Sequence, residues 1–380
     1  MKLEEGLRGR MAVIVLTDQG LVLGRKIINS FRGREMGLTM ELWVSESANS
    51  KATGECHTFK RLAEIMPQLW KKSALLIFVM AAGIVVRQVA PLIQSKDRDP
   101  AVLVLDQKGR FVIPLLSGHL GGANAWAKEV ADQLKAQPVI TTATDVEGLT
   151  APDEYARRLG WIVKPTSGLK RANRYLLANR CLKVYSEVTL SPDHPLRKDE
   201  HYIFVGEEEK EQAQIWVTPF YKTSEKSARE SPSIESNLDS PSDLPWIILV
   251  PRVLSIGVGS RRGISKEKVL EAVDASLSSI GASRQSVSGI FSIDLKQHES
   301  GMIEAAHELG VPFQTFSAAE IQTLADEREL SRSEFVKEKI GVDGVCEAAS
   351  LLGTKHGELI LPKQKQSGVT VAISMERFLS

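Results

Sequence analysis

The sequence predicts an α/β protein in which N-terminal and C-terminal α/β domains with mostly parallel sheets are joined by a smaller α+β middle domain. Short apolar runs alternate with amphipathic stretches of helical spacing at both ends of the chain, as in repeated strand–helix–strand units. The middle breaks this alternation, and a Ser/Pro-rich, highly charged segment follows it. With 380 residues, the chain is long enough for two or three domains.

The first domain is expected to span residues 1–144. Its strands are predicted at 11–16, 42–44, 74–79, 101–105, 111–115 and 139–142. Its helices are predicted at 18–31, at 59–71, from Gly83 onward, and after the glycines at 121 and 122. Because strands and helices alternate, we expect helices on both faces of the sheet.

The rest of the chain divides into three parts. The middle domain, 145–221, is predicted to hold a helix beginning at Pro152, a basic helix at 167–179 and strands at 182–188, 202–205 and 214–217. Residues 222–245 have almost nothing to bury and are predicted to form a mobile linker. In the last domain, 246–380, we expect strands at 253–258, 287–295 and 312–316, helices after Ser265 and at 300–309, 333–340 and 344–352, and a hairpin of 358–361 with 369–374.

Composition excludes several classes of protein. The formal net charge of +1 argues against a general nucleic-acid or membrane-surface binder. The apolar run at 73–86 is too short to span a bilayer, and the first ten residues lack the apolar core of a signal peptide. Three widely separated cysteines form no disulfide framework, so we expect a cytoplasmic protein. No metal-ligand spacing is present, and we predict no metal site.

One glycine-rich turn lies between a predicted strand and an amphipathic helix, at 117–124. Its glycines allow close backbone approach, and the helix N-terminus offers N–H groups to an anion. His119 can transfer a proton near neutral pH. A tight connection whose glycines serve packing alone explains the same pattern. The residues assigned here to substrate binding are Ser117, Gly118, Gly121, Gly122 and Asn124.

A second turn, at 257–263, resembles a dinucleotide-binding fingerprint, but its third glycine falls one residue late. Arg261 and Arg262 suit carboxylate binding at a helix N-terminus, and Gly257 and Gly259 would allow close approach. A solvated basic turn is the alternative.

Further candidates follow other strands. Gly83 and Arg87 are assigned to substrate binding, and Asp145 lies just after the last predicted strand of the first domain. Lys296 and Glu299 occupy a similar place in the last domain. These ionisable groups, with Glu347 on a small-residue helix, are candidate acids or bases, although helix caps and surface ion pairs use the same residue types.

Six stretches together resemble the cobalt-precorrin-5A hydrolase family of anaerobic cobalamin biosynthesis. They are MAAGIVVRQVAPLIQSKDRDPAVLVLDQKGRFVIPLLSGHLGGANAWA, VITTATDVEG, SIGVGSRRGIS, FSIDLKQHESGMIEAA, GVDGVCEAASLL and LPKQKQSGVTVAI. The resemblance covers most of the chain, is weakest in the middle, and implies the same three-domain layout.

The resemblance implies a specific reaction. The substrate would be a cobalt-bearing macrocycle with a δ-lactone and many carboxylate arms, and the enzyme would open the lactone with water and release acetaldehyde, giving cobalt-precorrin-5B. His119 or a carboxylate would then be the base, Lys296 and Glu299 would serve a second proton transfer, and Arg87, Arg261, Arg262 and Lys363 would hold carboxylate arms. Cobalt would arrive inside the substrate, so no separate cofactor is expected, and neighbouring pathway methyltransferases are candidate partners.

Two other functions stay open. A non-catalytic carrier of tetrapyrrole intermediates would need the same anion-binding turns. A nucleotide-dependent oxidoreductase is suggested only by the glycines at 257–263, whose spacing disfavours it. Acetaldehyde release and NAD(P) binding, respectively, would distinguish them from the hydrolase.

Overall fold

A computed structural model describes residues 9–33, 39–51, 56–95, 98–221, 245–328 and 345–379. The chain forms two compact units, Met1–Gly160 and Trp161–Ser380. The linker predicted at 222–245, apart from its last residue, and the helix predicted at 333–340 lie outside the described residues.

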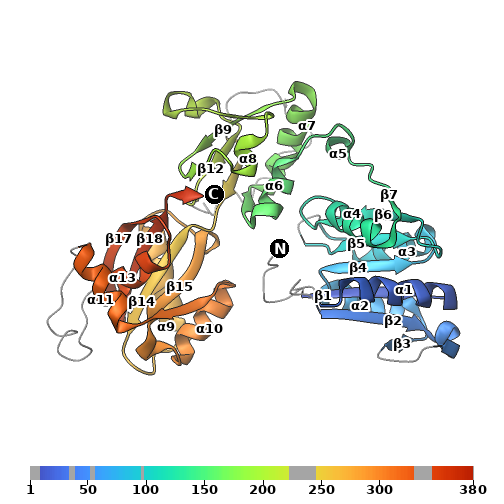
Figure 1. Ribbon diagram of the computed structural model, residues 1–380, viewed down its shortest axis with the longest axis horizontal. Helices are drawn as coiled ribbons and strands as arrows, with labels where there is room; N and C mark the ends of the chain where they lie inside the picture. Colours follow the sequence, from blue (N-terminus) through green and yellow to red (C-terminus); the bar gives the residue numbers. More distant parts are fainter. Residues whose placement is uncertain are drawn as a thin grey trace. The chain divides into compact units, whose positions relative to one another are not determined.

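The first unit is built on a seven-stranded sheet in the order β3-β2-β1-β4-β5-β6-β7. Along the chain, its strands are β1 (Arg10–Val15), β2 (Thr39–Ser45), β3 (His57–Phe59), β4 (Leu75–Val79), β5 (Ala101–Leu105), β6 (Phe111–Leu116) and β7 (Gln137–Pro138). Strands β1 to β5 run parallel, β6 runs antiparallel to β5, and β7 runs parallel to β6. The sheet is therefore mostly parallel, as predicted, with two reversed strands at one side (Figure 1).

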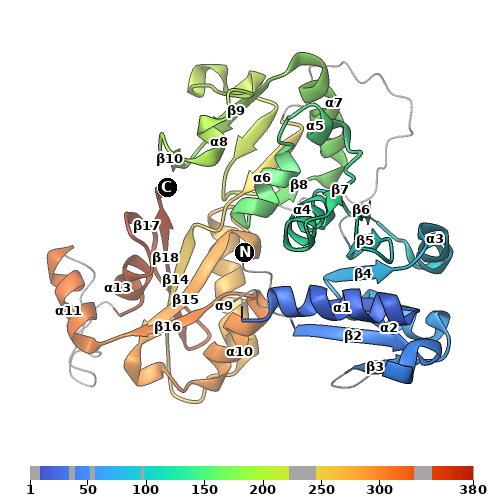
Figure 2. The same cartoon turned by 45° about the vertical axis from the view of Figure 1, so that its right-hand side comes forward.

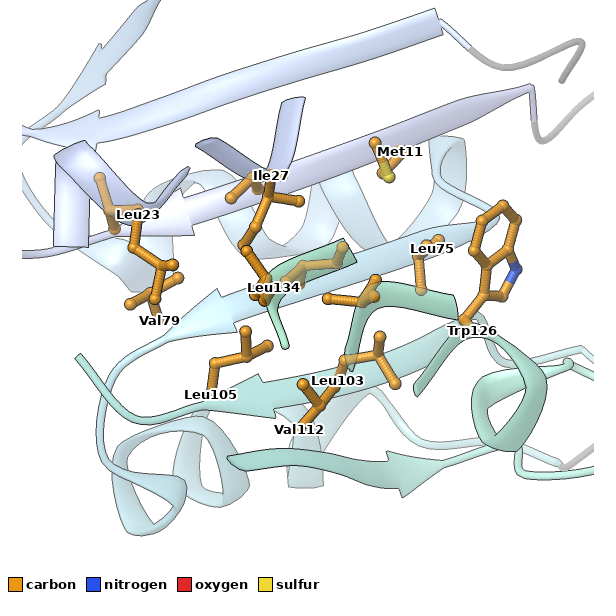
Figure 3. Packing of buried hydrophobic residues seen from close by; sticks show 14 of the residues in the cluster. Met11, Leu23, Ile27, Leu75, Val79, Leu103, Leu105, Val112, Trp126 and Leu134 are labelled. Carbon is orange, nitrogen blue, oxygen red and sulfur yellow. The ribbon is translucent and has the colours of Figure 1, made fainter. Parts of the chain in front are cut away.

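Helices cover both faces of this sheet, as expected from the alternation of strands and helices. They are α1 (Asp18–Phe31), α2 (Leu62–Lys72), α3 (Ala82–Val89) and α4 (Ala123–Leu134). Two further helices, α5 (Ala143–Val146) and α6 (Pro152–Leu159), follow β7 along the chain. Successive strand residues point to opposite faces, so Val13 packs with α1 and α4, whereas Ile14 packs with α2 and α3. Figure 3 shows the first of these cores, where Ile27 of α1 and Leu134 of α4 meet the strands. Burying each such aliphatic side chain contributes roughly 1.5–3 kcal/mol.

The last strand of this sheet is shorter and earlier than predicted. The sequence suggested residues 139–142, whereas β7 is Gln137–Pro138, pairing only with Phe111 and Val112 of β6. The N–H groups of Gln137 and Val139 donate to the carbonyls of Arg110 and Val112, so the missing N–H of Pro138 faces away from β6 at the edge of the sheet. The chain then leaves the sheet and forms the short helix α5.

The second unit contains two five-stranded sheets. One has the order β11-β9-β12-β13-β8 and the other the order β16-β15-β14-β18-β17. The strands of the first are β8 (Ile162–Lys164), β9 (Leu182–Ser186), β11 (Tyr202–Phe204), β12 (Ile215–Val217) and β13 (Ile247–Val250). Those of the second are β14 (Leu254–Ser260), β15 (Val287–Ile293), β16 (Phe313–Phe316), β17 (Gly357–Gln366) and β18 (Val369–Glu376). A separate pair joins β10 (Thr189–Leu190) to β19 (Phe378–Leu379).

The helices of the second unit include those that the amphipathic stretches predicted within the described residues, with two additions. They are α7 (Leu169–Asn179), α8 (Pro195–Lys198), α9 (Lys266–Ser279), α10 (Ser300–Leu309), α11 (Ala318–Glu327) and α13 (Val345–Leu352). Helices α9 and α10 lie side by side (Figure 2). The additions are the short helix α8 and helix α11, which begins with a capping box between Ser317 and Glu320.

Two observations concern the neighbourhood of the predicted domain boundaries. Residues 145–160 group with the first unit, and two of their carboxylates, those of Asp145 and Asp153, contact His119. Strand β13, predicted as the start of the last domain, pairs with β12 and β8 of the other sheet.

Candidate functional site

The predicted site residues of the first unit lie at two opposite edges of its sheet. Strand β6 runs against β5, with Leu116 beside Val102, so the turn after β6 lies where the parallel strands begin. Gly83 and Arg87 instead follow β4 and lie at the edge where the parallel strands end. These two groups of predicted residues therefore do not lie together. Only the turn at 117–124 and Asp145 come together, because β7 runs parallel to β6.

The turn after β6 is held mainly by its own backbone. Ser117 has a left-handed conformation (φ 58°), and a Cβ on Gly121 would lie 2.4 Å from the Ser117 Cβ. The N–H groups of Gly122, Ala123 and Asn124 donate to carbonyls of His119, Ser117 and Gly118, respectively. The N–H of Gly122 is thus not available as the predicted anion donor, and Gly121 is required for close packing.

This backbone holds the His119 ring between two carboxylates. Its Nε2 lies 3.3 Å from Oδ2 of Asp145, and its Nδ1 lies 3.3 Å from Oδ2 of Asp153. The hydroxyl oxygen of Thr144 is also 3.3 Å from Nε2. The side chains of His119 and Asp153 are 12% and 4% exposed, so water screens these contacts little.

The two carboxylates favour a protonated ring. A neutral imidazole has one N–H and one lone pair, whereas ionised carboxylates on both sides need two N–H donors. Burial lowers the pKa of His119, but the hydrogen bond and charge of Asp153 and the charge of Asp145 outweigh it and raise that pKa. The arrangement therefore favours His119 as an acid or a cationic hydrogen-bond donor, and the role as general base stays a prediction.

Asp145 is held in place by hydrogen bonds from two neighbouring side chains. Its Oδ2 accepts from Nδ2 of Asn124 at 2.9 Å, and its Oδ1 accepts from Nζ of Lys128 at 3.0 Å. Burial raises its pKa, but the hydrogen bonds from Lys128 and Asn124 lower it below the ordinary value. Asn124, which also donates to Thr142, is 3% exposed, so it positions Asp145 rather than presenting itself to a substrate as predicted.

A small pocket of about 150 Å³ lies beside these groups. His119, Asp145, Lys128 and Arg158 line it with the segment 148–151. Lys128 and Arg158 are 54% and 52% exposed, so they present positive charge at its opening. Within the described residues, no group of three or more His, Cys, Asp and Glu side chains could hold a metal ion.

The other edge of this sheet carries a different surface. Arg87 donates from Nη1 to the carbonyl of Gly83 at 2.9 Å, one turn earlier in α3. A second, mainly apolar pocket lies nearby, lined among others by Met80, Ala82 and Ile113. Gly83 and Arg87 are exposed, and their role in substrate binding stays a prediction.

In the second unit, Lys296 and Glu299 form an ion pair of 3.1 Å, and Glu299 also stabilises the turn after β14. Glu299 accepts from the backbone N–H of Gly263 at 2.6 Å. Burial raises the pKa of Glu299, but Lys296 and the backbone N–H groups of Gly263 and Ile264 bring it below its ordinary value. The geometry is that of a structural clamp, and the proton-transfer role predicted for the pair stays untested.

The remaining predicted residues of this unit have distinct environments. Arg261 and Arg262 are exposed on the turn that Glu299 stabilises by accepting a hydrogen bond from Gly263. Glu347 is buried on α13 and accepts from the backbone N–H of Lys363 at 3.0 Å. It is therefore placed to hold the hairpin rather than to meet solvent.

The surroundings of Gly257 and Gly259 explain these glycines by packing, whereas the sequence assigned them to substrate binding. A Cβ on Gly257 would lie 1.7 Å from the carbonyl oxygen of Cys346, so this glycine lets α13 pack directly on β14. A Cβ on Gly259 would lie 2.6 Å from the Thr370 hydroxyl oxygen. Both positions are occupied by neighbouring protein atoms, and packing explains the glycines.

Sequence reasoning missed Asp153, Lys128 and Arg158. Asp153 follows Pro152 in the first turn of α6, where an acidic residue is typical of a helix start and signals nothing further. Lys128 is one of many charged residues on the exposed side of an amphipathic helix. Only the return of the chain after β7 shows that these groups surround His119.

Together, the fold and the pocket define a class: a multi-domain α/β enzyme in which a carboxylate-flanked histidine lines a small charged cavity. Families described as Cobalamin synthesis G N-terminal, Cobalamin biosynthesis central region and Cobalamin synthesis G C-terminus match residues 64–145, 150–230 and 254–374. His119 and Asp145 fall within the first match, and Asp153 within the second.

Curated relatives extend this similarity along the chain. A cobalt-precorrin-5A hydrolase of Priestia megaterium is 28% identical over 99% of each chain. One of Salmonella typhimurium is 32% identical over 79% of this chain and 81% of its own. A crystal structure of a cobalamin biosynthesis protein G homologue from Sulfolobus solfataricus covers 98% of this chain and 99% of its own, at 20% identity and a TM-score of 0.39.

The chain belongs to the cobalt-precorrin-5A hydrolase family of cobalamin biosynthesis. It is an enzyme of the hydrolase class, and the family resemblance seen in its sequence is confirmed. Among the described residues, no helix combines the length and the apolar character that a membrane span requires.

Proposed function

We propose that this enzyme opens the δ-lactone of cobalt-precorrin-5A with water and then releases the two-carbon unit as acetaldehyde, leaving cobalt-precorrin-5B. The observation that supports a chemical role for the first unit is the His119 ring, held between two carboxylates at the wall of a small pocket. Family membership supports the substrate.

Lactone opening proceeds through attack of water on the ester carbonyl. The C–O bond to the ring oxygen then breaks, giving a carboxylate and a free hydroxyl group. Negative charge develops on oxygen in the transition state, and a preorganised cationic donor in a poorly hydrated site stabilises it. In this proposal the Nε2–H of His119 exchanges its contact with Asp145 for one with the substrate and protonates the departing oxygen, while Asp153 keeps the other ring nitrogen.

Acetaldehyde release is a carbon–carbon cleavage. The liberated hydroxyl loses its proton, its oxygen forms the carbonyl of acetaldehyde, and the electron pair of the broken C–C bond passes to the macrocycle carbon, which is then protonated. The cobalt arrives within the substrate in this proposal, and no other cofactor is required. Lys296 and Glu299 are candidates for this second proton transfer, as their place after β15 suggested.

The proposal includes a cytoplasmic reaction. The three cysteines Cys56, Cys181 and Cys346 are free, which suits a reducing compartment. It also includes transfer of the labile intermediate from and to neighbouring methyltransferases of the pathway, supported by the family's place in cobalamin biosynthesis.

The test measures acetaldehyde and lactone opening when the purified enzyme meets cobalt-precorrin-5A. We expect wild type to release one acetaldehyde per substrate, and His119→Gln to lose about 10²-fold or more in kcat, the usual contribution of a positioned proton donor. His307→Gln, on the exposed side of α10, is the matched control. Substrate binding without acetaldehyde in wild type would establish a carrier instead, and full turnover by His119→Gln would remove His119 from the mechanism.

A further inference from the structure

The pocket beside His119 is much smaller than a macrocycle. Its volume of about 150 Å³ is roughly that of five liquid waters. Sites for drug-sized ligands enclose roughly 300–1,000 Å³. The pocket therefore accommodates one short substituent of a large substrate, while the rest of that substrate stays outside.

The charges that line the pocket favour an anion. With His119 protonated, the lining side chains carry three positive charges, on His119, Lys128 and Arg158, and two negative ones, on Asp145 and Glu154. A monoanion would balance the remaining positive charge. Outside the lining, Asp153 lies beside His119 and adds a negative charge. Arg157, which lies 3.0 Å from Glu154, adds a positive charge that offsets it.

The two exposed cations keep hydrogen-bonding capacity toward the opening. Lys128 donates to Asp145 at 3.0 Å, but an ammonium group has three N–H donors. Arg158 contacts Glu154 through Nε at 2.9 Å, but a guanidinium has five. The buried side chains of Leu149 and Ala151 add apolar surface to the lining. This combination matches a carboxylate carried on one or two methylene groups.

We propose that this pocket is a subsite for a single short carboxylate arm of the substrate, held by Arg158 and Lys128. The inference rests on the proposed function and adds to it the group that enters the pocket. With one arm bound here, the part of the macrocycle that carries this arm would lie next to His119. Arg158 is the cleaner of the two cations to test, because Lys128 also contacts Asp145 of the His119 cluster.

The kinetic test compares Arg158→Met and Arg158→Lys with wild type on cobalt-precorrin-5A. We expect Arg158→Met to raise KM about threefold to tenfold with little change in kcat, since a half-exposed charged hydrogen bond to substrate is lost. Arg158→Lys should restore part of the loss. Arg61→Met is the matched control, because Arg61 is exposed and pairs with Glu64 on α2. An Arg158→Met enzyme with the KM of the control would overturn the subsite.

A second test needs no turnover and therefore separates this inference from the proposed function. Sodium propionate and the uncharged, nearly isosteric propionamide are titrated into substrate-free enzyme, and the His119 ring signals are followed by NMR. We expect a saturable shift with propionate alone, weakened severalfold by Arg158→Met but not by Arg61→Met. Equal responses to both compounds, or no response to either, would refute a carboxylate subsite, whatever the enzyme does with cobalt-precorrin-5A.

Discussion

Asp153→Asn tests the electrostatic reasoning about the His119 cluster. The substitution removes one negative charge 3.3 Å from Nδ1 while keeping the size of the side chain and an oxygen that accepts a hydrogen bond. Asp145 remains on the other side of the ring. Because Asp153 is the principal group that raises the pKa of His119, we expect that pKa to fall in the variant.

The effect on stability follows from the type of hydrogen bond that is exchanged. A bond involving a charged group contributes about 1.5–3 kcal/mol and a neutral one about 0.5–1.5 kcal/mol. We therefore expect Asp153→Asn to lower the free energy of unfolding by about 1 kcal/mol near pH 6. The pKa of His119 is raised in the folded protein, so this stabilisation is complete below the unfolded pKa of about 6.5 and disappears as pH rises through the folded pKa.

The assay has two parts. Histidine ¹⁵N NMR follows the His119 ring through a pH titration, with His119→Gln identifying its signals. Urea unfolding at about pH 6 and about pH 9 then compares the free energies of wild type and Asp153→Asn. An unchanged pKa of His119 in the variant, or a stability difference that is the same at both pH values, would refute the doubly donating ring.

Three further predictions concern the turns. Gly121→Ala should lower the free energy of unfolding by about 1–3 kcal/mol, because its Cβ would lie 2.4 Å from that of Ser117, and urea unfolding measures it; wild-type stability would contradict the packing role. Gly257→Ala should cost more, because its Cβ would meet the backbone carbonyl of Cys346 at 1.7 Å, and it should lower the Tm in calorimetry. Glu299 has a lowered pKa, so its stabilisation is present above the unfolded pKa of about 4.3 and is lost as pH falls through the folded pKa. Acid titration by circular dichroism should therefore show a pH-dependent stability advantage over Glu299→Gln, and parallel stability curves would contradict the clamp.

Local features of the fold could be predicted from the sequence because they depend on nearby residues. Helix α1 has the predicted bounds of 18 and 31, since an apolar stripe and the cap at Thr17 lie within the segment itself. Helix α10 also has its predicted bounds, 300 and 309. In α1, helical periodicity and the cap at Thr17 agree, whereas α10 has no capping side chain and depends on its apolar periodicity.

The direction of β6 could not be predicted in the same way. Its residues form a strand in either orientation, and only pairing with β5 decides which edge of the sheet receives the following turn. This single reversal separates Arg87 from His119, although both were assigned to one kind of site. The rule that places ligands at the carboxyl ends of parallel strands, applied in the sequence to Asp145, therefore does not hold for the reversed strand β7.

The site was found in part. Placing His119 on a turn after a strand, near Asp145 at the end of the next, was enough to nominate both. The second carboxylate, Asp153, was missed because its contact with His119 depends on the path of the chain after β7. The role of Gly257 was misread because a glycine that admits a helix and a glycine that admits a ligand look the same in a sequence.

The pairing of β10 with β19 has a consequence for the order of folding. Thr189 and Phe378, which face each other there, are about 190 residues apart along the chain. Closing so long a loop in an unfolded chain would cost about 4–5 kcal/mol in entropy, which two pairs of strand residues cannot offset. We therefore expect β10 and β19 to pair only after the intervening sheets have formed and brought the two strands close together. Their pairing would then be a late step of folding and not part of the folding nucleus.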